Sequence, residues 1–493
     1  MVITPVHYIV APLIAAFAIP LLTKIHKDAA RVVPGIVLFY NVIVSFVLMK
    51  HIREHGMINE VLAGWQAPWG INLVVTPFTG YLASMVSILG FIIWLYGFRF
   101  KRTLKGGEIK FYEILQMMMI AGSIGIIITG DIFNLFVFIE IVGISAFSLT
   151  AFYRSRDGAE AGFKYLLIGG FASAFLLLGI IIIYTQTGSL NMAQIAERMP
   201  DVPQQMKIIA LIFFLVALGI EAEMFPLNGW APDAYSQAPT PTSATFAAVV
   251  SVAGVYALIR VIYTMFDVEG VNNYLMIMGF VSMLIAEIAA ISQKNLKRML
   301  AYSSMGQIGL VLIAFGIGSK LAVFGALFLM LNHGVIKSLL FMTGSYFIYN
   351  TEDKKIKSLN GIYKKLPFVS FLFGLGALAL IGFPPFSGFW SKFYILMSAA
   401  DEKYIFLIIG ILLVTIIELT YYLRVVGRIF FAKEEGEPAS HKPSINAIIA
   451  MSSLALFIVV IGVYPDLIMP HIQSAADALL DKSNYIQQIL SLN

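Results

Sequence analysis

Apolar residues in this chain come in long runs rather than in alternation with polar residues, and short polar stretches separate the runs. A membrane-spanning helix needs about 20 consecutive apolar residues. The pattern therefore predicts about fourteen membrane-spanning segments. These segments cover residues 3–22, 34–50, 77–97, 112–129, 131–153, 162–185, 207–230, 242–265, 272–292, 299–316, 319–349, 368–398, 404–427 and 445–466.

The runs are long and rich in Leu, Ile, Ala and Met, which favours helices over strands. Composition agrees with a lipid environment, because 59% of the residues are hydrophobic and only 12% are charged. A soluble chain could not bury that much apolar surface. We therefore expect an all-α polytopic membrane protein with one membrane domain, residues 1–493, whose first run is a membrane helix and not a cleavable signal.

The chain contains no cysteine. This excludes disulfides, thiolate nucleophiles, iron–sulfur ligation by cysteine and cysteine-type zinc sites. We therefore expect no metal site and no cofactor in this chain, and we expect any redox chemistry to belong to a partner.

The basic residues are distributed unevenly between the two sides of the predicted bundle. When successive loops are assigned to opposite sides, 21 of the 33 Lys and Arg residues fall on one side, 7 on the other and 5 within segments. The positive-inside rule places the basic side in the cytoplasm and both termini outside it, in a plasma membrane. The basic residues thus indicate topology, and we expect the partners to be lipid and other membrane subunits, with no nucleic acid.

The end of the chain differs from the rest. After Pro470, apolar residues recur at helical intervals at Ile472, Ala475, Leu479, Ile486 and Leu490. This spacing predicts an amphipathic helix at the membrane surface.

Several ionisable residues lie inside the predicted segments. Glu140 is about ten residues into its segment, which corresponds to a depth of about 15 Å. Lys337 is central in its segment, and His333, four residues earlier, lies on the same helical face. A charge at such depth is expensive unless it is paired or protonated, so a role in proton movement is expected. The alternative for all three is a polar contact between neighbouring helices.

Other charges lie closer to segment ends. Lys164 can extend its ammonium group to the interface, so a path role and an anchor role are both open. Arg260, Glu287 and Arg424 are interpreted as interface anchors. Glu418 is deeper and has Tyr421 and Tyr422 close by.

Two segments are expected to be broken. Glu221 and Glu223 precede the stretch "FPLNGW", and Lys392 follows the similar stretch "FPPFSGFW". The predicted helix-breaking residues are Pro226, Gly229, Pro384, Pro385 and Gly388. The breaks lie in the seventh and twelfth segments, so the units that contain them have opposite topology, which is typical of ion sites in transporters built from inverted repeats. The alternative is a pair of proline kinks packed in the bundle.

Four motifs appear in order: FPLNGWAPDAYSQAPTPTSA, KNLKRMLAYSSMGQIGL, NHGVIKSLLFMTGS and GFPPFSGFWSKF. They resemble the antiporter-like subunits of respiratory complex I, Mrp-type sodium/proton antiporters and membrane-bound hydrogenases. The resemblance covers roughly residues 75–430, and the chain looks most like the D-type component of Mrp antiporters and its counterparts in hydrogenase-type complexes.

The resemblance implies fourteen helices and two inverted five-helix repeats, each with a broken helix. The corresponding domain boundaries are 1–111 for the N-terminal helices, 112–265 and 272–427 for the repeats, and 445–493 for the last helix and amphipathic tail.

The resemblance also implies roles for individual residues. Glu140 matches the family's glutamate in the fifth helix, Lys337 the lysine of the eleventh, and Lys392 the charged position after the second break. His333 falls on a recurrent histidine. Glu221 departs from the pattern, because relatives usually carry a lysine there.

These observations predict a proton-translocating subunit of a multi-subunit membrane complex, with Mrp-type sodium/proton antiport as the main hypothesis. The predicted proton pathway comprises Glu140, Lys164, Glu221, Glu223, His333, Lys337, Lys392 and Glu418. Neighbouring carboxylates at the first break cannot both ionise at low cost, so we expect a shared proton or a bound Na⁺ there. One alternative is a pumping subunit of a hydrogenase or quinone-reducing complex, and another is a structural membrane anchor with inactive channels.

Overall fold

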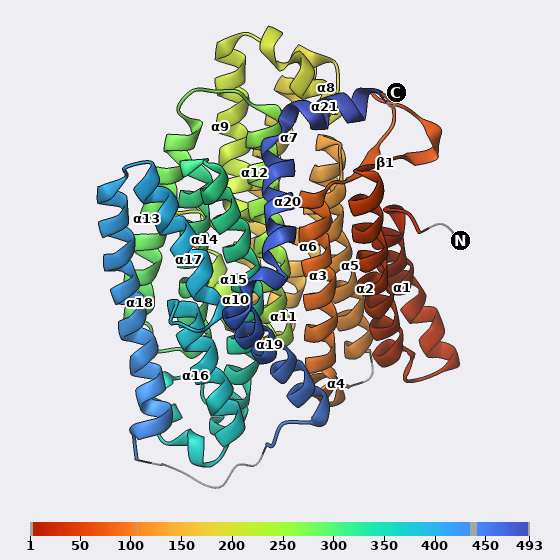
Figure 1. Ribbon diagram of the computed structural model, residues 1–493. Helices are drawn as coiled ribbons and strands as arrows, with labels where there is room; N and C mark the ends of the chain where they lie inside the picture. Colours follow the sequence, from red (N-terminus) through yellow and green to blue (C-terminus); the bar gives the residue numbers. More distant parts are fainter. Residues whose placement is uncertain (1–2, 106, 434–440, 492–493) are drawn as a thin grey trace.

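The computed structural model describes residues 3–105, 107–433 and 441–491, which form a bundle of helices along a common axis (Figure 1). The first half of the bundle contains α1 (Val6–Ile25), α2 (Ala29–His55), α3 (Pro77–Tyr96), α4 (Phe98–Thr103), α5 (Glu108–Ile128), α6 (Ile132–Thr150), α7 (Arg156–Thr187), α8 (Met192–Arg198), α9 (Gln204–Glu221), α10 (Ala231–Gln237), α11 (Thr240–Thr245), a π-helix (Phe246–Val250) and α12 (Ser251–Met265).

The second half contains α13 (Val271–Ser292), α14 (Leu296–Ile317), α15 (Lys320–Thr351), α16 (Pro367–Ile381), α17 (Ser387–Asp401), α18 (Ile405–Phe431), α19 (Ile445–Val463), α20 (Met469–Leu480) and α21 (Lys482–Ser491). Short 3-10 turns cover Leu62–Gly64, Met199–Asp201, Ile356–Leu359, Ile362–Lys364 and Pro465–Leu467.

Within the described residues, thirteen helical stretches are long and apolar enough to cross a membrane, and α11, the π-helix and α12 together form one of them. The remaining predicted segment corresponds to the shorter pair α16 and α17. The predicted all-α polytopic fold is therefore confirmed. The inverted symmetry of the two repeats and the domain boundaries stay predictions.

The centre of the bundle is formed by α15 and by the span that contains α11 and α12. The most apolar windows of these two spans are completely buried, whereas 28% of the corresponding window is buried in α7 and in α18. Because α15 carries His333 and Lys337, the two residues are buried inside the protein and do not face lipid.

One end of the bundle carries a β-hairpin that the apolar pattern does not predict. Strands β1 (Ile58–Val61) and β2 (Asn72–Val75) pair antiparallel, with Ile58 opposite Val75. The Asn191 amide donates to Asn72 Oδ1 at 3.0 Å, which ties the hairpin to the segment before α8. Nearby, Asp131 caps α6 by accepting from the Asn134 backbone at 2.7 Å, and burial raises the pKa of Asp131 to about 6.

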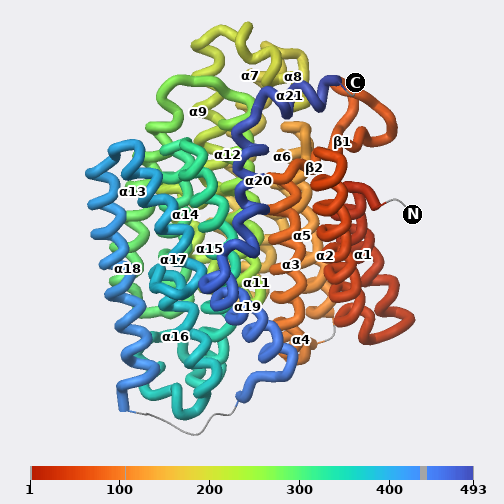
Figure 2. The backbone as a smooth tube through the Cα atoms, viewed as in Figure 1, coloured from red at the N-terminus to blue at the C-terminus, as the bar shows by residue number. Residues whose placement is uncertain are grey.

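The C-terminal tail forms two helices instead of the single helix predicted. In Figure 2, α20 runs along the bundle, where it contacts α3 and α15, and α21 then packs against α8 at the hairpin end. The predicted apolar face of α20 is buried at Ile472, Ala475 and Leu479. The prediction of a helix lying on the membrane surface is therefore wrong for α20, because its apolar face is covered by two helices of the same chain.

Candidate functional site: a row of buried charges

The seventh spanning segment is interrupted between α9 and α10, where the sequence predicted a break. The helix ends at Glu221, and Glu223 adopts a left-handed backbone with φ of 55°. The Phe225–Pro226 peptide is cis, and the Phe225 N–H donates to Ser282 Oγ on α13 at 2.9 Å. The break also contains Gly229. Glu223, Met224 and Asn228 of the break are buried, whereas Pro226 and Gly229 are exposed. At membrane depth, such irregular backbone is tolerated where it is buried in protein or lines a water-filled cavity.

Glu223 is the most enclosed carboxylate of this break. Its side chain is buried, and Glu223 Oε1 accepts hydrogen bonds from Tyr235 Oη at 2.7 Å and from Ser251 Oγ at 2.6 Å. The donors come from α10 and α12. Gly254 lets α12 approach, because a Cβ atom there would lie 2.2 Å from the carbonyl oxygen of Glu221. The two helices on either side of the break thus hold the carboxylate in place.

Glu140 and Glu221 complete a group of three carboxylates. The Glu221 side chain interacts electrostatically with those of Glu140 and Glu223. Glu140 on α6 accepts a hydrogen bond from the Ser173 hydroxyl on α7 and is partly exposed at the side of the bundle. The three carboxylates thus belong to the first half of the site, and the shared proton or bound Na⁺ expected there stays a prediction.

The twelfth spanning segment is interrupted between Ile381, the last residue of α16, and Ser387, the first residue of α17. The Pro384–Pro385 peptide in the break is cis. Gly388 permits a close approach across the break, because a Cβ atom there would lie 1.9 Å from the carbonyl oxygen of Ala379.

Lys392 on α17 connects the second break with α18. Its ammonium group donates to the carbonyl oxygen of Ile381 at 3.2 Å and pairs with Glu418 Oε2 on α18 at 2.6 Å. Glu418 Oε1 also accepts from the Gln307 amide on α14 at 2.6 Å. The sequence predicted Glu418 and Lys392 as two members of the pathway without pairing them. The structure shows that they form a direct ion pair.

Lys337 lies between the two breaks and is fully buried. Its ammonium group donates to the carbonyl oxygen of Leu300 at 3.2 Å and to Tyr422 Oη at 3.3 Å. It interacts electrostatically with Glu287, Glu418 and Lys392 of the second half and with Glu223 of the first break. Lys337 thus connects the carboxylates of the first break with the charges of the second half.

His333 lies one helical turn before Lys337 on α15 and is buried, as the predicted shared face requires. Neither ring nitrogen makes a hydrogen bond of regular geometry within the described part of the chain, although the backbone of Ala247 lies close to the ring. At this level α15 packs against the π-helix of residues 246–250. His333 is therefore enclosed between α15 and this π-helix, next to Lys337.

Glu287 was interpreted from the sequence as an interface anchor, and the structure contradicts this. The side chain is buried between α13 and α14, where a Cβ atom at Gly306 would lie 2.0 Å from Glu287 Oε1. It interacts electrostatically with Glu418 and Lys337. Glu287 therefore belongs to the group of charges that we call the charge row, or the row. Its members are Glu140, Glu221, Glu223, Glu287, Lys337, Lys392 and Glu418.

The two arginines interpreted as anchors differ from each other. Arg260 is buried, with its guanidinium 4.1 Å from the centre of the Tyr485 ring on α21, so the anchor interpretation is wrong for Arg260. Arg424 donates to the carbonyl oxygens of Ile291 and Gln293 at the end of α13, at 2.7 Å and 3.2 Å. Arg424 thus caps a neighbouring helix.

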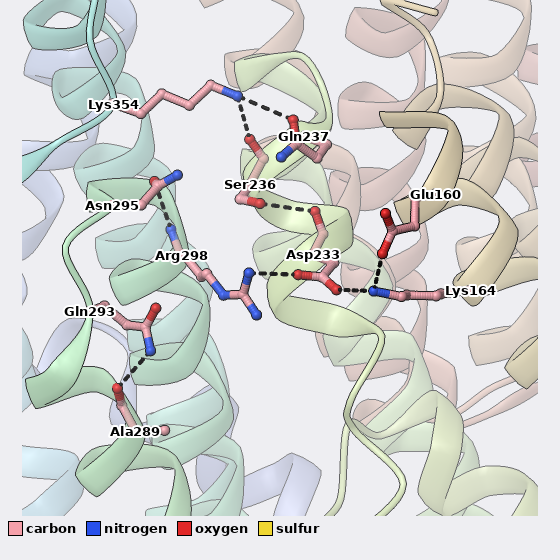
Figure 3. A network of polar contacts seen from close by, with 10 residues as sticks. All are labelled: Glu160, Lys164, Asp233, Ser236, Gln237, Ala289, Gln293, Asn295, Arg298 and Lys354. Atoms are coloured by element: carbon pink, nitrogen blue, oxygen red, sulfur yellow. Dashed lines mark hydrogen bonds and ion pairs between the residues drawn. The ribbon is translucent and has the colours of Figure 1, made fainter. Parts of the chain in front are cut away.

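Lys164 is not part of the row. Its ammonium group pairs with Glu160 at 2.7 Å and with Asp233 at 3.2 Å, and Asp233 also pairs with Arg298 on α14 at 2.8 Å (Figure 3). These ion pairs fix α10 between α7 and α14 at the end of the bundle rich in Lys and Arg, which we call the basic end.

Lys354 holds the other end of α10, where it donates to the Ser236 carbonyl oxygen at 3.2 Å (Figure 3). Burial lowers the pKa of Lys354.

Sequence reasoning also missed the hydroxyl groups that position the charges. Tyr235, Ser251 and Tyr422 come from three different helices, and no local pattern marks them. For Glu287, the sequence offered one signal of burial, which was Gly306 on the next helix. A small residue allows two membrane helices to approach closely.

The family model described as NADH:quinone oxidoreductase/Mrp antiporter, transmembrane, matches residues 129–417, which is more than half of the chain. The chain belongs to this family. The N component of NADH-quinone oxidoreductase from Desulforudis audaxviator is 34% identical over 86% of this chain and 85% of that protein. The D component of the Na⁺/H⁺ antiporter from Alkalihalophilus pseudofirmus is 29% identical over 98% of both chains.

Solved structures agree with the assignment. A chain of an archaeal membrane-bound sulfane sulfur reductase is 35% identical, with a TM-score of 0.93, over 99% of this chain and all of that one. A chain of the Mrp complex from Dietzia is 23% identical, with a TM-score of 0.89 over 98% of both chains, and supports the fold alone. The predicted resemblance is thus confirmed, and the chain is a transmembrane antiporter-like subunit of the complex I and Mrp family.

Proposed function

We propose that the chain translocates protons as a subunit of a larger membrane complex, with sodium/proton antiport as its activity. The observation that carries this proposal is the position of Lys337, which interacts with Glu223 at the first break and with Glu287, Glu418 and Lys392 in the second half. Buried ionisable residues in membrane helices are typical of proton relays. A purely structural role would leave the large desolvation penalty of these charges without a purpose.

The row suggests how charge could move. Protons would pass among Glu140, Glu221 and Glu223 in the first half. Lys337 would relay the change of charge, with His333 as the adjacent exchangeable group. Because charges interact strongly in a protein interior, a change at Lys337 would shift the protonation equilibrium of both neighbouring groups. The Lys392–Glu418 pair would respond in the second half.

Sodium exchange is best supported at the first break. Three carboxylates lie together there, and Na⁺ is a hard cation that carboxylate and carbonyl oxygens can bind. A cation could replace a shared proton at Glu221 or Glu223. This competition would couple outward movement of one ion to inward movement of the other.

The proposed setting is a plasma membrane with the basic end in the cytoplasm and both termini outside. The excess of Lys and Arg in the loops at that end supports this orientation. Glu140 is partly exposed beside Gly143, and further along the same side Gly169 and Gly170 have open space around their Cα atoms. Small residues let membrane helices approach closely, so this side is proposed to receive a helix of a partner subunit.

Transport in inverted membrane vesicles that contain the whole complex tests the proposal. The wild type should exchange protons for Na⁺, and Glu140→Ala should abolish exchange while the protein still inserts. Glu54→Ala removes an exposed carboxylate at a helix end and is the control that should transport normally. If Glu140→Ala transports like the control, Glu140 is not in the path.

A second candidate function is ion pumping within a redox complex. The observation that favours it is the 35% identity to a chain of the sulfane sulfur reductase, against 29% to the D component of the antiporter. Copurification of the subunits decides between the two functions. Redox subunits, with transport that requires an electron donor, would support pumping, whereas antiport without any donor would support the main proposal.

A further inference from the structure

A second pair of buried charges lies at the basic end, apart from the row described above. Lys101 on α4 pairs with Glu113 on α5 at 2.8 Å, and both side chains are 2% exposed. The Lys101 ammonium group also lies 4.5 Å from the centre of the Trp94 ring. Two charges this deeply buried require an explanation, because a buried ion pair is weak evidence for stability by itself.

The pair lines a small cavity of about 20 Å³ between α2, α3, α4, α5 and α11. Two further polar groups lie in the same wall: Trp94 Nε1 and Gln116 Oε1 are buried and lack a hydrogen-bond partner among the residues the structure describes. Buried polar groups of native proteins are normally satisfied by protein or by ordered water. The space that the centre of a water molecule can reach is about 20 Å³. One buried water needs roughly 10–15 Å³ of such space, so the cavity has room for about one water molecule that could bind these groups.

The cavity is placed between the basic end and the first break. Towards the basic end, a second cavity of about 110 Å³, lined by Arg99 and His441, shares the wall residue Pro241 with it. Towards the interior, the Gln116 amide donates to Tyr112 Oη at 2.8 Å, and the Thr242 hydroxyl donates to the same oxygen at 3.4 Å.

Thr242 belongs to α11, which leads through the π-helix into α12, and α12 carries the Ser251 hydroxyl that binds Glu223. Thr242 and Ser251 are thus two polar positions on the same span, nine residues or about 13 Å apart, with the apolar π-helix of residues 246–250 between them.

We propose that the Lys101–Glu113 cavity is a hydrated proton-binding site that loads the first half of the charge row from the basic end. This proposal rests on the proposed function. A proton that arrives through water converts the Glu113 carboxylate into the acid, and Lys101 keeps its charge, so the site gains one positive charge. Release of the proton towards Tyr112 and Thr242 restores the ion pair.

A merely structural ion pair would behave differently. Replacing both members of such a pair by apolar residues of similar volume is often neutral or stabilising. The double variant Lys101→Met/Glu113→Leu therefore separates the two roles, because it removes the proton site without leaving an unpaired charge. The reversed pair, Lys101→Glu/Glu113→Lys, keeps a carboxylate in the cavity. The matched control is Lys320→Met/Asp477→Leu, which removes an exposed ion pair of 2.7 Å far from the cavity.

The first experiment measures proton uptake by inverted vesicles that contain the whole complex, at equal amounts of inserted protein. We expect the double variant Lys101→Met/Glu113→Leu to be at least tenfold slower than the wild type, the reversed pair to keep part of the activity, and the control to match the wild type. Wild-type rates in the double variant would overturn the proposal. A wild type that does not transport would instead refute the proposed function.

The second experiment needs no activity and leaves the ion pair intact. The chain has no cysteine, so Gln116→Cys introduces a single thiol into the cavity wall. Methyl methanethiosulfonate reacts with thiols that meet water, and we expect it to modify Gln116→Cys at least tenfold faster than Met119→Cys. Met119 lies on the same helix, is buried and does not line the cavity. Equal, slow modification of both would show that the cavity is dry and would overturn the proposal.

Discussion

The Lys392–Glu418 pair offers the sharpest separation of structure from transport. The two side chains are 9% and 3% exposed and lie 2.6 Å apart. Removing one partner leaves a buried charge without compensation, which costs about 3–5 kcal/mol. We therefore expect Lys392→Met and Glu418→Leu each to lower the thermal midpoint in detergent markedly.

The double variant Lys392→Met/Glu418→Leu should recover most of that loss. Replacing a buried pair by apolar residues is neutral or stabilising by about 1–4 kcal/mol. The Gln307 amide, which donates to Glu418 at 2.6 Å, would lose its acceptor, and an unsatisfied buried donor costs about 1–3 kcal/mol. The two effects nearly cancel, so the double variant should lie within about 2 kcal/mol of the wild type.

Transport should follow a different pattern from stability. Because the double variant has no charge at either position, it should fail to exchange protons in vesicles although it folds as well as the wild type. Normal transport by the double variant would show that the pair is a structural contact. Single variants as stable as the wild type would show that the ion pair does not form in the folded protein.

Two further predictions concern Lys337 and Asp131. Lys337→Ala and Lys337→Arg should both abolish transport, the second because a guanidinium group does not release its proton at accessible pH. Normal exchange by the arginine variant would show that Lys337 acts as a fixed charge. Burial raises the pKa of Asp131 from 3.8 to about 6. The contribution of Asp131 to the free energy of unfolding is therefore most favourable below pH 3.8. It falls by up to about 3 kcal/mol as the pH rises through about 6. Asparagine keeps the helix cap, so Asp131→Asn should raise the thermal midpoint at pH 8 and leave it nearly unchanged at pH 4; an unchanged midpoint at pH 8 would contradict this account.

The sequence predicted the spanning helices well because membrane helices satisfy their backbone hydrogen bonds within one segment. The breaks were also predictable, since Pro226 and Pro384 stand with small and polar residues inside apolar runs. The hairpin of β1 and β2 was not, because its strands have only four residues each, too short for a clear alternating pattern. The course of α20 depends on contacts with α3 and α15, which no local pattern contains.

The site was less predictable than the fold. Depth along a helix can be estimated at about 1.5 Å per residue, but the side to which a residue points depends on its neighbours. Glu287 was therefore misplaced at an interface although it lies against Gly306 inside the bundle. Partners such as Lys392 and Glu418 come from different helices, and their pairing appears only when the helices are packed.

The two halves of the row are not equivalent, and this bears on how they are coupled. The first half gathers the carboxylates Glu140, Glu221 and Glu223, whereas the second half balances Glu287 and Glu418 with Lys392. The positive group that interacts with Glu223 is Lys337, which the second half supplies. Since like charges cannot all ionise together at low cost, the interaction of Glu223 with Lys337 offers a link between the two halves. If Lys337 lost a proton, as proposed, the change in charge would act on Glu223 at the first break and on Glu287 and Glu418 in the second half. In a chain with a separate lysine in each half, one lysine would not have to act on both.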